Sequence, residues 1–323
     1  MTKQTTAIVF PGQGSQTVGM GKDLFENFQS AKDVFNEVDD ILGLKLSKIM
    51  FEGPADELTQ TQNTQPALMA VSIALTTVME KEFGTKISDI CSFVAGHSLG
   101  EYSALCAAGA ISLSQTAKLL QIRGNSMAEC GAKTQGSMAA ILGVEIDVAN
   151  AIASEAAQGE VCQVANDNSV GQIVISGSKS AILRAIEIAK AKGAKRAIEL
   201  PVSGAFHSAL MQDAQDKMKI ALDAAEIKSP LIPVVANVTA SVVTDPAQIR
   251  DLLARQITGS VRWRETMLYL ESQGIKEVIE IGSGKVLAGL VGRTCKDMTA
   301  KSVQNLEDIK ILLPSGKILL PSG

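Results

Sequence analysis

Short runs of apolar residues alternate with longer helical patterns along the chain. The run at 7–10 predicts a buried strand that breaks at 11–14 and is followed by a helix. A second apolar run, 90–95, comes after a helical stretch at 66–83 and leads through a glycine-bounded turn into a helix from Glu101. This repeated order of strand, turn and helix predicts a parallel sheet covered by helices, with the chemistry in loops at the carboxyl ends of the strands.

The stretch 131–203 has a different order of elements. It follows the order βαββαβ, with strands at 138–142, 161–165, 172–176 and 195–200 and helices at 147–157 and 180–192. Such a split βαβ unit forms a small antiparallel sheet of its own. We therefore expect an α/β fold in which a ferredoxin-like subdomain at 131–203 is inserted into an α/β-hydrolase-like core made of 1–130 and 204–309.

The C-terminal part of the sequence contains two further short strands and an unusual end. The strands are expected at 234–236 and 278–281. Residues 310–316 and 317–323 are identical, and each copy ends in Pro-Ser-Gly, which is unfavourable in a core. We expect 310–323 to be a non-native or disordered tail and assign it no function.

Composition narrows the class of protein. The 30 Lys and Arg residues against 34 Asp and Glu give a net charge of −4, and 3% of the residues are aromatic, which argues against nucleic-acid binding. No apolar run reaches the roughly 18 residues that a bilayer span requires, and no signal-peptide pattern precedes the first strand. We expect a cytoplasmic protein with no membrane partner.

Cysteine and histidine usage argues against a metal site. The five cysteines are widely spaced with no Cys-x-x-Cys pair, which indicates reduced thiols. The histidines are His97 and His207, too few for a His-rich metal centre. We expect no metal.

The turn Gly96-His97-Ser98-Leu99-Gly100 has the spacing of a nucleophile elbow. Small residues on both sides of Ser98 allow a bend sharp enough to expose its hydroxyl at the start of a helix. In that geometry the amide of Leu99 points into the site, where the helix dipole favours negative charge. The alternative is an ordinary glycine-rich turn with a solvated serine.

A serine nucleophile needs a base, and the two histidines are the candidates. His97 adjoins Ser98, and adjacent side chains on such a turn diverge, so a structural role in the loop is the preferred interpretation. His207 lies in Gly204-Ala205-Phe206-His207-Ser208, where the chain returns from the insertion to the core. We favour His207 as the base over a surface or core histidine.

The glycine-rich loop Gly12-Gln13-Gly14-Ser15-Gln16 does not fit a nucleotide-binding motif. A dinucleotide fingerprint requires glycine at the position of Thr17, and Gly284-Lys285 lacks the other residues of a Walker phosphate loop. The loop could place a backbone amide beside the elbow as a second oxyanion donor, or it could be a plain turn.

Arg123 shares the apolar stripe of its predicted helix with Leu119, Leu120 and Met127. A cation in that position requires an anion or a route to solvent. An internal Asp or Glu partner, a side chain reaching the surface, and a substrate carboxylate held bidentately are all compatible with the spacing.

Six motifs taken together resemble a known family. Over about residues 6–300 the chain resembles the malonyl-CoA:acyl carrier protein transacylases of fatty acid synthesis, and related acyltransferase domains of polyketide synthases share most of these motifs. The motifs are Gly12-Gln13-Gly14-Ser15-Gln16, Thr64-Gln65-Pro66-Ala67, Gly96-His97-Ser98-Leu99-Gly100-Glu101, Gln121-Ile122-Arg123-Gly124, Ala165-Asn166-Asp167-Asn168-Ser169 and Gly204-Ala205-Phe206-His207-Ser208.

The resemblance implies a ping-pong transfer through a malonyl-serine ester. Ser98 would attack malonyl-CoA, and His207 would act as general base and then acid. The amides of Gln13 and Leu99 would hold the oxyanion. The thiol of the phosphopantetheine arm of acyl carrier protein would then collect the malonyl group, without ATP, metal or redox cofactor. Arg123 would pair with the malonyl carboxylate.

The resemblance assigns roles to further residues. Phe206 resembles a pocket wall that leaves little room for a methyl branch, and Met127 is expected to line the same site. Gln256 matches a loop whose amide or main-chain oxygen orients the histidine. Asn168 resembles a residue that approaches the substrate from the small subdomain, with an Asx turn as the alternative.

The resemblance also places a docking surface and leaves rival functions open. Lys195 and Arg196 match the proposed contact for the acidic carrier protein, although such charges are often only solvated. We expect a monomer. A serine esterase or thioesterase would use the same serine and histidine, and a non-catalytic acyl-binding module is a further alternative.

Overall fold

The computed structural model describes residues 5–313, and its first strand, β1 (Thr6–Phe10), is buried along its whole length. β1 lies inside a six-stranded sheet between β2 (Phe93–Gly96) and β9 (Glu277–Ile281), and pairs in parallel with both. A strand buried on both faces has a continuous apolar run, as here. The full strand order is β10-β9-β1-β2-β7-β8, where β10 is Thr299–Val303, β7 is Val234–Ala236 and β8 is Ser241–Val243, antiparallel to β7.

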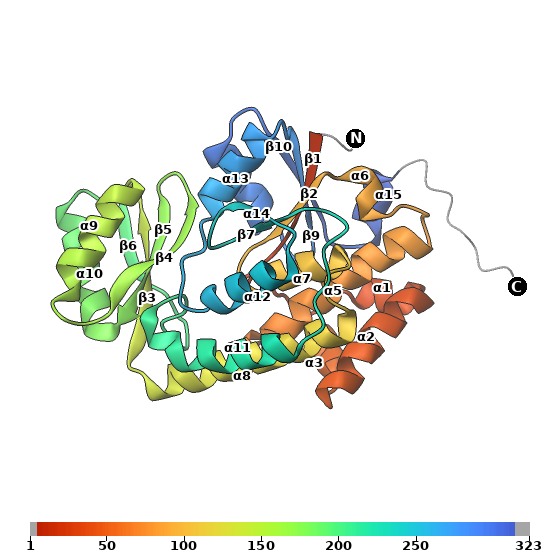
Figure 1. Ribbon diagram of the computed structural model, residues 1–323, viewed down its shortest axis with the longest axis horizontal. Coiled ribbons are helices and arrows are strands. Elements are labelled where there is room, and N and C mark those ends of the chain that lie inside the picture. The colour runs from red at the N-terminus through yellow and green to blue at the C-terminus, as the bar shows by residue number, and fades with distance from the viewer. Residues whose placement is uncertain (1–4, 314–323) are drawn as a thin grey trace, which may run out of the picture.

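Helices cover both faces of this sheet (Figure 1). Ile8 and Phe10 point to one face and join a large core, and Ala7 and Val9 point to the other, as strand alternation requires. The first core is formed with α2 (Gln29–Leu42), α5 (Thr61–Lys81), α7 (Gly100–Ala107), α8 (Leu113–Lys133), α11 (Gln212–Ala224) and α12 (Pro246–Arg255). The second is formed with α13 (Trp263–Ser272) and α14 (Val286–Thr294).

The remaining helical segments of the core region are short. They are α1 (Lys22–Asn27), α3 (Leu46–Glu52), α4 (Ala55–Thr59), α6 (Ile87–Ile90), α15 (Leu306–Leu312) and a 3-10 turn at Ala209–Met211. Between residues 5 and 313, no helix combines the length and the hydropathy that crossing a bilayer would require.

A second, antiparallel sheet lies beside the first and has its own core (Figure 1, left). Its strand order is β4 (Cys162–Ser169), β5 (Gln172–Ser178), β3 (Gly136–Leu142) and β6 (Arg196–Glu199). The helices α9 (Ile146–Ala157) and α10 (Lys179–Ala191) pack on it through alanine and isoleucine side chains. The predicted fold class, a parallel-sheet core with a separate antiparallel βαββαβ unit, is confirmed. The domain boundaries at 131 and 203 stay predictions.

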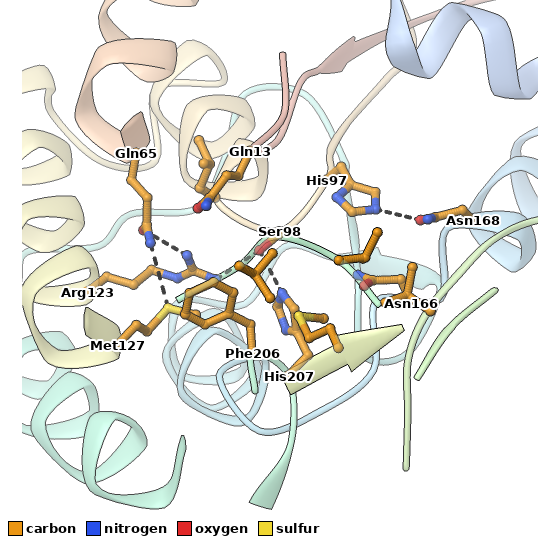
Figure 2. Close-up of a pocket in the computed structure, with 15 residues that line it drawn as sticks. Gln13, Gln65, His97, Ser98, Arg123, Met127, Asn166, Asn168, Phe206 and His207 are labelled. Carbon is orange, nitrogen blue, oxygen red and sulfur yellow. Dashed lines mark hydrogen bonds between the residues drawn. The ribbon is translucent and has the colours of Figure 1, made fainter. Parts of the chain in front are cut away.

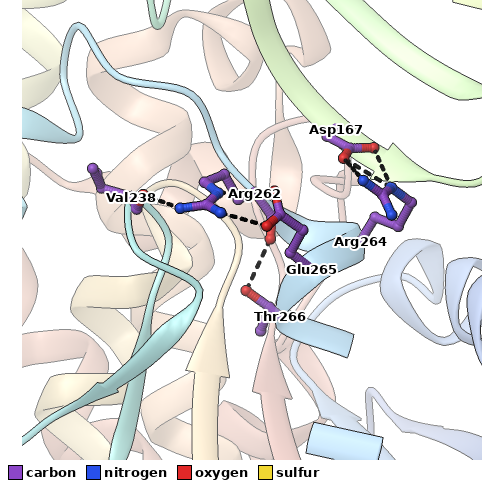
Figure 3. A network of polar contacts seen from close by, with 6 residues as sticks. All are labelled: Asp167, Val238, Arg262, Arg264, Glu265 and Thr266. Carbon is purple, nitrogen blue, oxygen red and sulfur yellow. Dashed lines mark hydrogen bonds and ion pairs between the residues drawn. The ribbon is translucent and has the colours of Figure 1, made fainter. Parts of the chain in front are cut away.

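Backbone pairing and an ion pair join the small subdomain to the core. β4 forms a parallel bridge with the segment before α13, in which Val261 N donates to Ala165 O at 2.8 Å and Asp167 N donates to Val261 O at 3.0 Å. One turn further, Arg264 pairs with the carboxylate of Asp167 at 2.8 Å (Figure 3). The small subdomain is therefore fixed to the core at the strand that contributes most to the pocket described below.

Several element boundaries differ from the sequence prediction. α5 begins at Thr61, ahead of Pro66, and in its first turn the side chains of Asn63 and Thr64 donate to the main-chain oxygens of Glu57 and Leu58 in α4. Proline favours a first helical turn but does not force one. The strand expected at 90–95 begins only at Phe93, because 87–90 forms α6.

The C-terminal end of the described chain also differs from expectation. Strands β8 and β10 were not predicted. β8 has three residues, too few to show an alternation, and β10 reads Thr-Ala-Lys-Ser-Val, which does not alternate strictly between polar and apolar residues. α15 ends at Leu312, so residues 310–312, the first three of the expected tail, belong to a helix. The rest of the predicted tail, 314–323, lies outside the described residues.

Candidate active site

The strand-to-helix turn after β2 has the sharp geometry expected of a nucleophile elbow. Ser98 has φ = 52°, a left-handed conformation that is uncommon outside glycine. A Cβ atom at Gly96 would lie 1.9 Å from the main-chain carbonyl of Gly100, and one at Gly100 would lie 2.3 Å from Phe10 O. Both flanking positions therefore accept only glycine, and the serine is held at the N-terminus of α7.

Ser98 and His207 meet although 109 residues separate them (Figure 2). Ser98 Oγ lies 2.8 Å from His207 Nε2, and His207 Nδ1 lies 2.8 Å from the main-chain oxygen of Gln256. Because a carbonyl oxygen can only accept, Nδ1 carries the proton and Nε2 is free to accept from the serine hydroxyl. Gln256 thus contacts the imidazole through its main chain, one of the two forms that the sequence prediction allowed.

The surroundings of His207 keep it neutral. Burial, followed by the charge of Arg123, lowers the pKa of His207 to about 3. The imidazole is therefore unprotonated at neutral pH and can receive a proton, as a general base must.

Arg123 lies on α8, is 1% exposed and points at the nucleophile. Its Nη1 donates to Gln65 Oε1 at 2.7 Å, and its Nη2 donates to Ser98 Oγ at 3.0 Å and Gln256 Oε1 at 2.9 Å. The guanidinium carbon lies 5.7 Å from the centre of the Tyr102 ring. These hydrogen bonds all go to neutral oxygens, so the structure shows neither an Asp or Glu ion pair for Arg123 within 5–313 nor a side chain that reaches the surface.

The glycine-rich loop after β1 packs against the turn. A Cβ atom at Gly12 would lie 2.7 Å from His97 O, so only glycine lets the two loops approach this closely. Gln13 and Leu99 both line the pocket. Within the described chain, neither of their main-chain N–H groups donates to a protein acceptor. Both amides are thus available to an oxyanion formed beside Ser98.

The pocket lies between the core and the small subdomain (Figure 2). Met127 and Phe206, both predicted to line it, do so. Both subdomains contribute residues to the lining of the pocket. The complete lining is Gln13, Gln65, His97, Ser98, Leu99, Arg123, Met127, Met138, Asn166, Asn168, Val174, Leu200, Val202, Phe206 and His207.

His97 and Asn168 form a contact across the pocket. His97 Nε2 donates to Asn168 Oδ1 at 2.8 Å, and the His97 ring packs edge-on against Trp263. Burial lowers the pKa of His97, which favours the neutral ring. The structural role predicted for His97 fits these contacts. Asn168 lines the pocket and is held by His97.

Lys195 and Arg196 are exposed but are not brought to the pocket. They lie at the start of β6, whereas Leu200, after its other end, lines the pocket. A strand rises about 3.3 Å per residue, so the pair lies on the order of 13 Å along the strand from Leu200. A partner that contacted them would dock on the small subdomain, away from the catalytic groups.

Sequence reasoning missed several residues of the site. Gln65 stands in a motif noted above, yet its contact with Arg123 depends on how α5 packs on α8. Asn237 contacts Ser98 from 139 residues away, and no local signal marks it. Glu101, 2% exposed, accepts from Gln256 Nε2 at 2.7 Å, and burial raises its pKa to about 7.

Between residues 5 and 313, no group of three or more His, Cys, Asp or Glu side chains is arranged to hold a metal ion. The site instead joins a hydroxyl, an imidazole, two amides and a buried guanidinium. The hydroxyl, the imidazole and the two amides at a strand-to-helix turn are typical of enzymes that form an acyl-serine ester.

Comparison with known proteins agrees with that class. Residues 7–313 match the family model described as "Acyl transferase domain". A malonyl CoA-acyl carrier protein transacylase of Bacillus subtilis is 45% identical over 96% of this chain and 97% of its own. The crystal structure of an acyl-carrier-protein-S-malonyltransferase from Bartonella henselae is 52% identical, with a TM-score of 0.92, and covers 96% of this chain and 98% of its own.

A further similar structure includes a partner. A malonyl-transacylase solved in complex with a type II PKS acyl-carrier protein is 40% identical to this chain, with a TM-score of 0.91, over 96% of this chain and 99% of its own. The chain therefore belongs to the acyl transferase family and, within it, to the malonyl CoA-acyl carrier protein transacylases.

Proposed function

We propose that this chain transfers the malonyl group of malonyl-CoA to the phosphopantetheine thiol of acyl carrier protein, and so supplies fatty acid synthesis. The observation that carries the proposal is the buried Arg123, whose Nη2 lies 3.0 Å from Ser98 Oγ. A fixed cation beside the nucleophile has a clear use if the acyl group carries its own carboxylate.

In the first half-reaction, Ser98 attacks the thioester carbonyl as its hydroxyl proton moves to His207 Nε2. The oxygen of the tetrahedral intermediate accepts from the amides of Gln13 and Leu99. The intermediate then collapses, the carbon–sulfur bond breaks, and the coenzyme A sulfur takes the proton from Nε2. Malonyl-serine and free coenzyme A remain.

The second half-reaction reverses these steps with a different thiol. The pantetheine S–H gives its proton to His207, and the sulfur attacks the ester carbonyl. The carbon–oxygen bond to Ser98 breaks, and the serine oxygen recovers the proton. Since a thioester enters and a thioester leaves, the exchange needs no ATP, metal or redox cofactor.

Substrate choice follows from the pocket walls. Arg123 holds the malonyl carboxylate, and Phe206 and Met127 bound the space beside it. Asn168 reaches the same space from the small subdomain and is kept in place by His97. We propose that these contacts favour malonyl over acetyl and disfavour a methyl branch.

The remaining partners are also part of the proposal. The acidic carrier protein docks on the small subdomain through Lys195 and Arg196, which are exposed there. The enzyme acts as a cytoplasmic monomer, without nucleic-acid or membrane partners.

Loss of malonyl-CoA measured with and without holo-carrier protein tests the proposal against hydrolysis. We expect transfer far faster than hydrolysis, and no transfer by Ser98→Ala. Hydrolysis as fast as transfer would identify a thioesterase instead, and no turnover of any acyl thioester would identify a binding module. Competition among malonyl-, methylmalonyl- and acetyl-CoA in the same assay tests the proposed selectivity.

A further inference from the structure

We propose that Asn237 is a positioning residue that holds the turn carrying Ser98 and decides which main-chain amide faces the substrate, an inference that rests on Ser98 being the nucleophile. Asn237 directly follows β7 and is fully buried. It does not line the pocket, so it acts through the turn and not on the substrate.

The side chain of Asn237 bridges both sides of the turn. Its Oδ1 accepts from Ser98 N at 2.7 Å, and its Nδ2 donates to Gly96 O at 2.7 Å. The amide orientation follows from these partners, because Ser98 N–H can only donate and the Gly96 carbonyl can only accept. One side chain therefore bonds both to the residue before the bend and to the main chain of Ser98 at the bend.

The turn needs such support because of its backbone. Ser98 is not glycine, yet it adopts φ = 52°, a conformation that persists where surrounding contacts impose it. By accepting from Ser98 N–H, Asn237 also removes that amide from the groups that could face the substrate. The neighbouring Leu99 N–H remains as the donor at the N-terminus of α7.

Asn237 is itself held from three directions. Its main-chain N–H donates to Glu101 Oε2 at 3.0 Å, and Gln256 Nε2 lies 3.3 Å from its Oδ1. On the opposite side its carbonyl accepts from Arg262 N at 3.1 Å. Arg262 also donates to Val238 O and pairs with Glu265, as Figure 3 shows. Asn237 thus connects the turn to the segment that binds the small subdomain.

The test uses a reagent that reports on Ser98 without any acyl donor. Phenylmethanesulfonyl fluoride modifies serine nucleophiles activated by a base, so its labelling rate measures how well Ser98 is presented to His207. We expect Asn237→Ala to label, and to turn over malonyl-CoA, about 100-fold more slowly than the unmodified enzyme, since small misplacements of a catalytic group have effects of about this size. The KM for malonyl-CoA should change less than about twofold, because none of the hydrogen bonds of Arg123 goes to Asn237.

A matched variant separates positioning from general loss of stability. Asp39 is 3% exposed, accepts from the main chain and side chain of Ser47, and is absent from the pocket lining. Asp39→Ala should lower the melting temperature and leave the labelling rate of Ser98 unchanged. If Asn237→Ala, once folded, labels at the rate of the unmodified enzyme, the proposal is overturned.

Two further measurements cover a variant that does not fold. Asn237→Asp has the same shape and keeps the acceptor for Ser98 N–H but cannot donate to Gly96 O, so it should also label more slowly. In the unmodified enzyme, NMR should show slow amide exchange at Ser98 and faster exchange at Leu99, and the reverse order would contradict the proposal. If malonyl transfer fails while labelling still depends on Asn237, the proposed function is wrong and this inference stands.

Discussion

Replacing Arg123 by alanine removes the buried cation beside Ser98 and leaves the pocket walls in place. In the structure, the guanidinium donates hydrogen bonds to Gln65 and Gln256, and its third hydrogen bond goes to the nucleophile itself. A malonyl group on Ser98 would bring its carboxylate to this guanidinium. An acetyl group would bring only a methyl group. The substitution should therefore affect the two acyl groups very differently.

The size of the effect follows from the burial of Arg123. Truncating one partner of a buried, hydrogen-bonded charge pair costs about 2–5 kcal/mol. At about 1.4 kcal/mol per factor of ten, kcat/KM for malonyl-CoA should fall by roughly 30- to 4,000-fold. Acetyl transfer has no carboxylate to lose, so the ratio of malonyl to acetyl transfer should fall by nearly the same factor. Arg123→Lys keeps the charge without the planar fork of the guanidinium, so its ratio of malonyl to acetyl transfer should lie between those of the unmodified enzyme and Arg123→Ala.

The assay is competition of malonyl-CoA and acetyl-CoA for transfer to holo-carrier protein, with products separated by mass. Arg250→Ala is the control, because it removes a half-buried arginine that donates to the main-chain oxygens of Leu222 and Ala225 and is absent from the pocket lining. It should leave the malonyl-to-acetyl ratio unchanged. An unchanged ratio in Arg123→Ala would refute the substrate-binding role of Arg123.

Three other predictions follow from charged groups in the structure. Because the pKa of His207 is lowered to about 3, its proton-accepting form is present above that pH. We therefore expect kcat/KM for malonyl-CoA not to decline as the pH falls from about 8 to 5, and a decline centred near pH 6.5 would contradict this. Arg264→Ala should lower the free energy of unfolding by about 3 kcal/mol in urea titrations near pH 7, because it leaves the buried carboxylate of Asp167 unpaired. The loss should be smaller at acid pH, where that carboxylate is protonated. Equal losses at both pH values would count against the ion pair. Charge reversal at Lys195 and Arg196 should raise the KM for carrier protein and leave the KM for malonyl-CoA unchanged. An equal change in both KM values would argue against docking at these residues.

The sequence predicted the parts of the site that have a local signature. Gly96 and Gly100 mark the turn because a side chain at either position would overlap the main chain, and this requirement is visible as glycine spacing. His207 could be selected because the chain has two histidines and the other adjoins the nucleophile. For Arg123, spacing predicted a place on the apolar stripe of its helix but left both its burial and its partner open, because these depend on Gln65 and Gln256 from other segments.

Contacts between distant segments could not be predicted in the same way. The side chains that β3, β4 and β5 turn toward the core depend on how the second sheet docks, and that docking is fixed by Asp167 and Arg264, 97 residues apart. Asn237 follows a three-residue strand and resembles any loop asparagine in sequence. Its role depends on the neighbouring strand β2 ending at the same edge of the sheet.

The most direct test of the central claim is intact mass spectrometry of the enzyme mixed with malonyl-CoA in the absence of carrier protein. We expect the mass to increase by one malonyl group, the modification to map to Ser98, and holo-carrier protein to remove it. An unmodified mass after mixing, or the same adduct on Ser98→Ala, would contradict a malonyl-serine intermediate at this site.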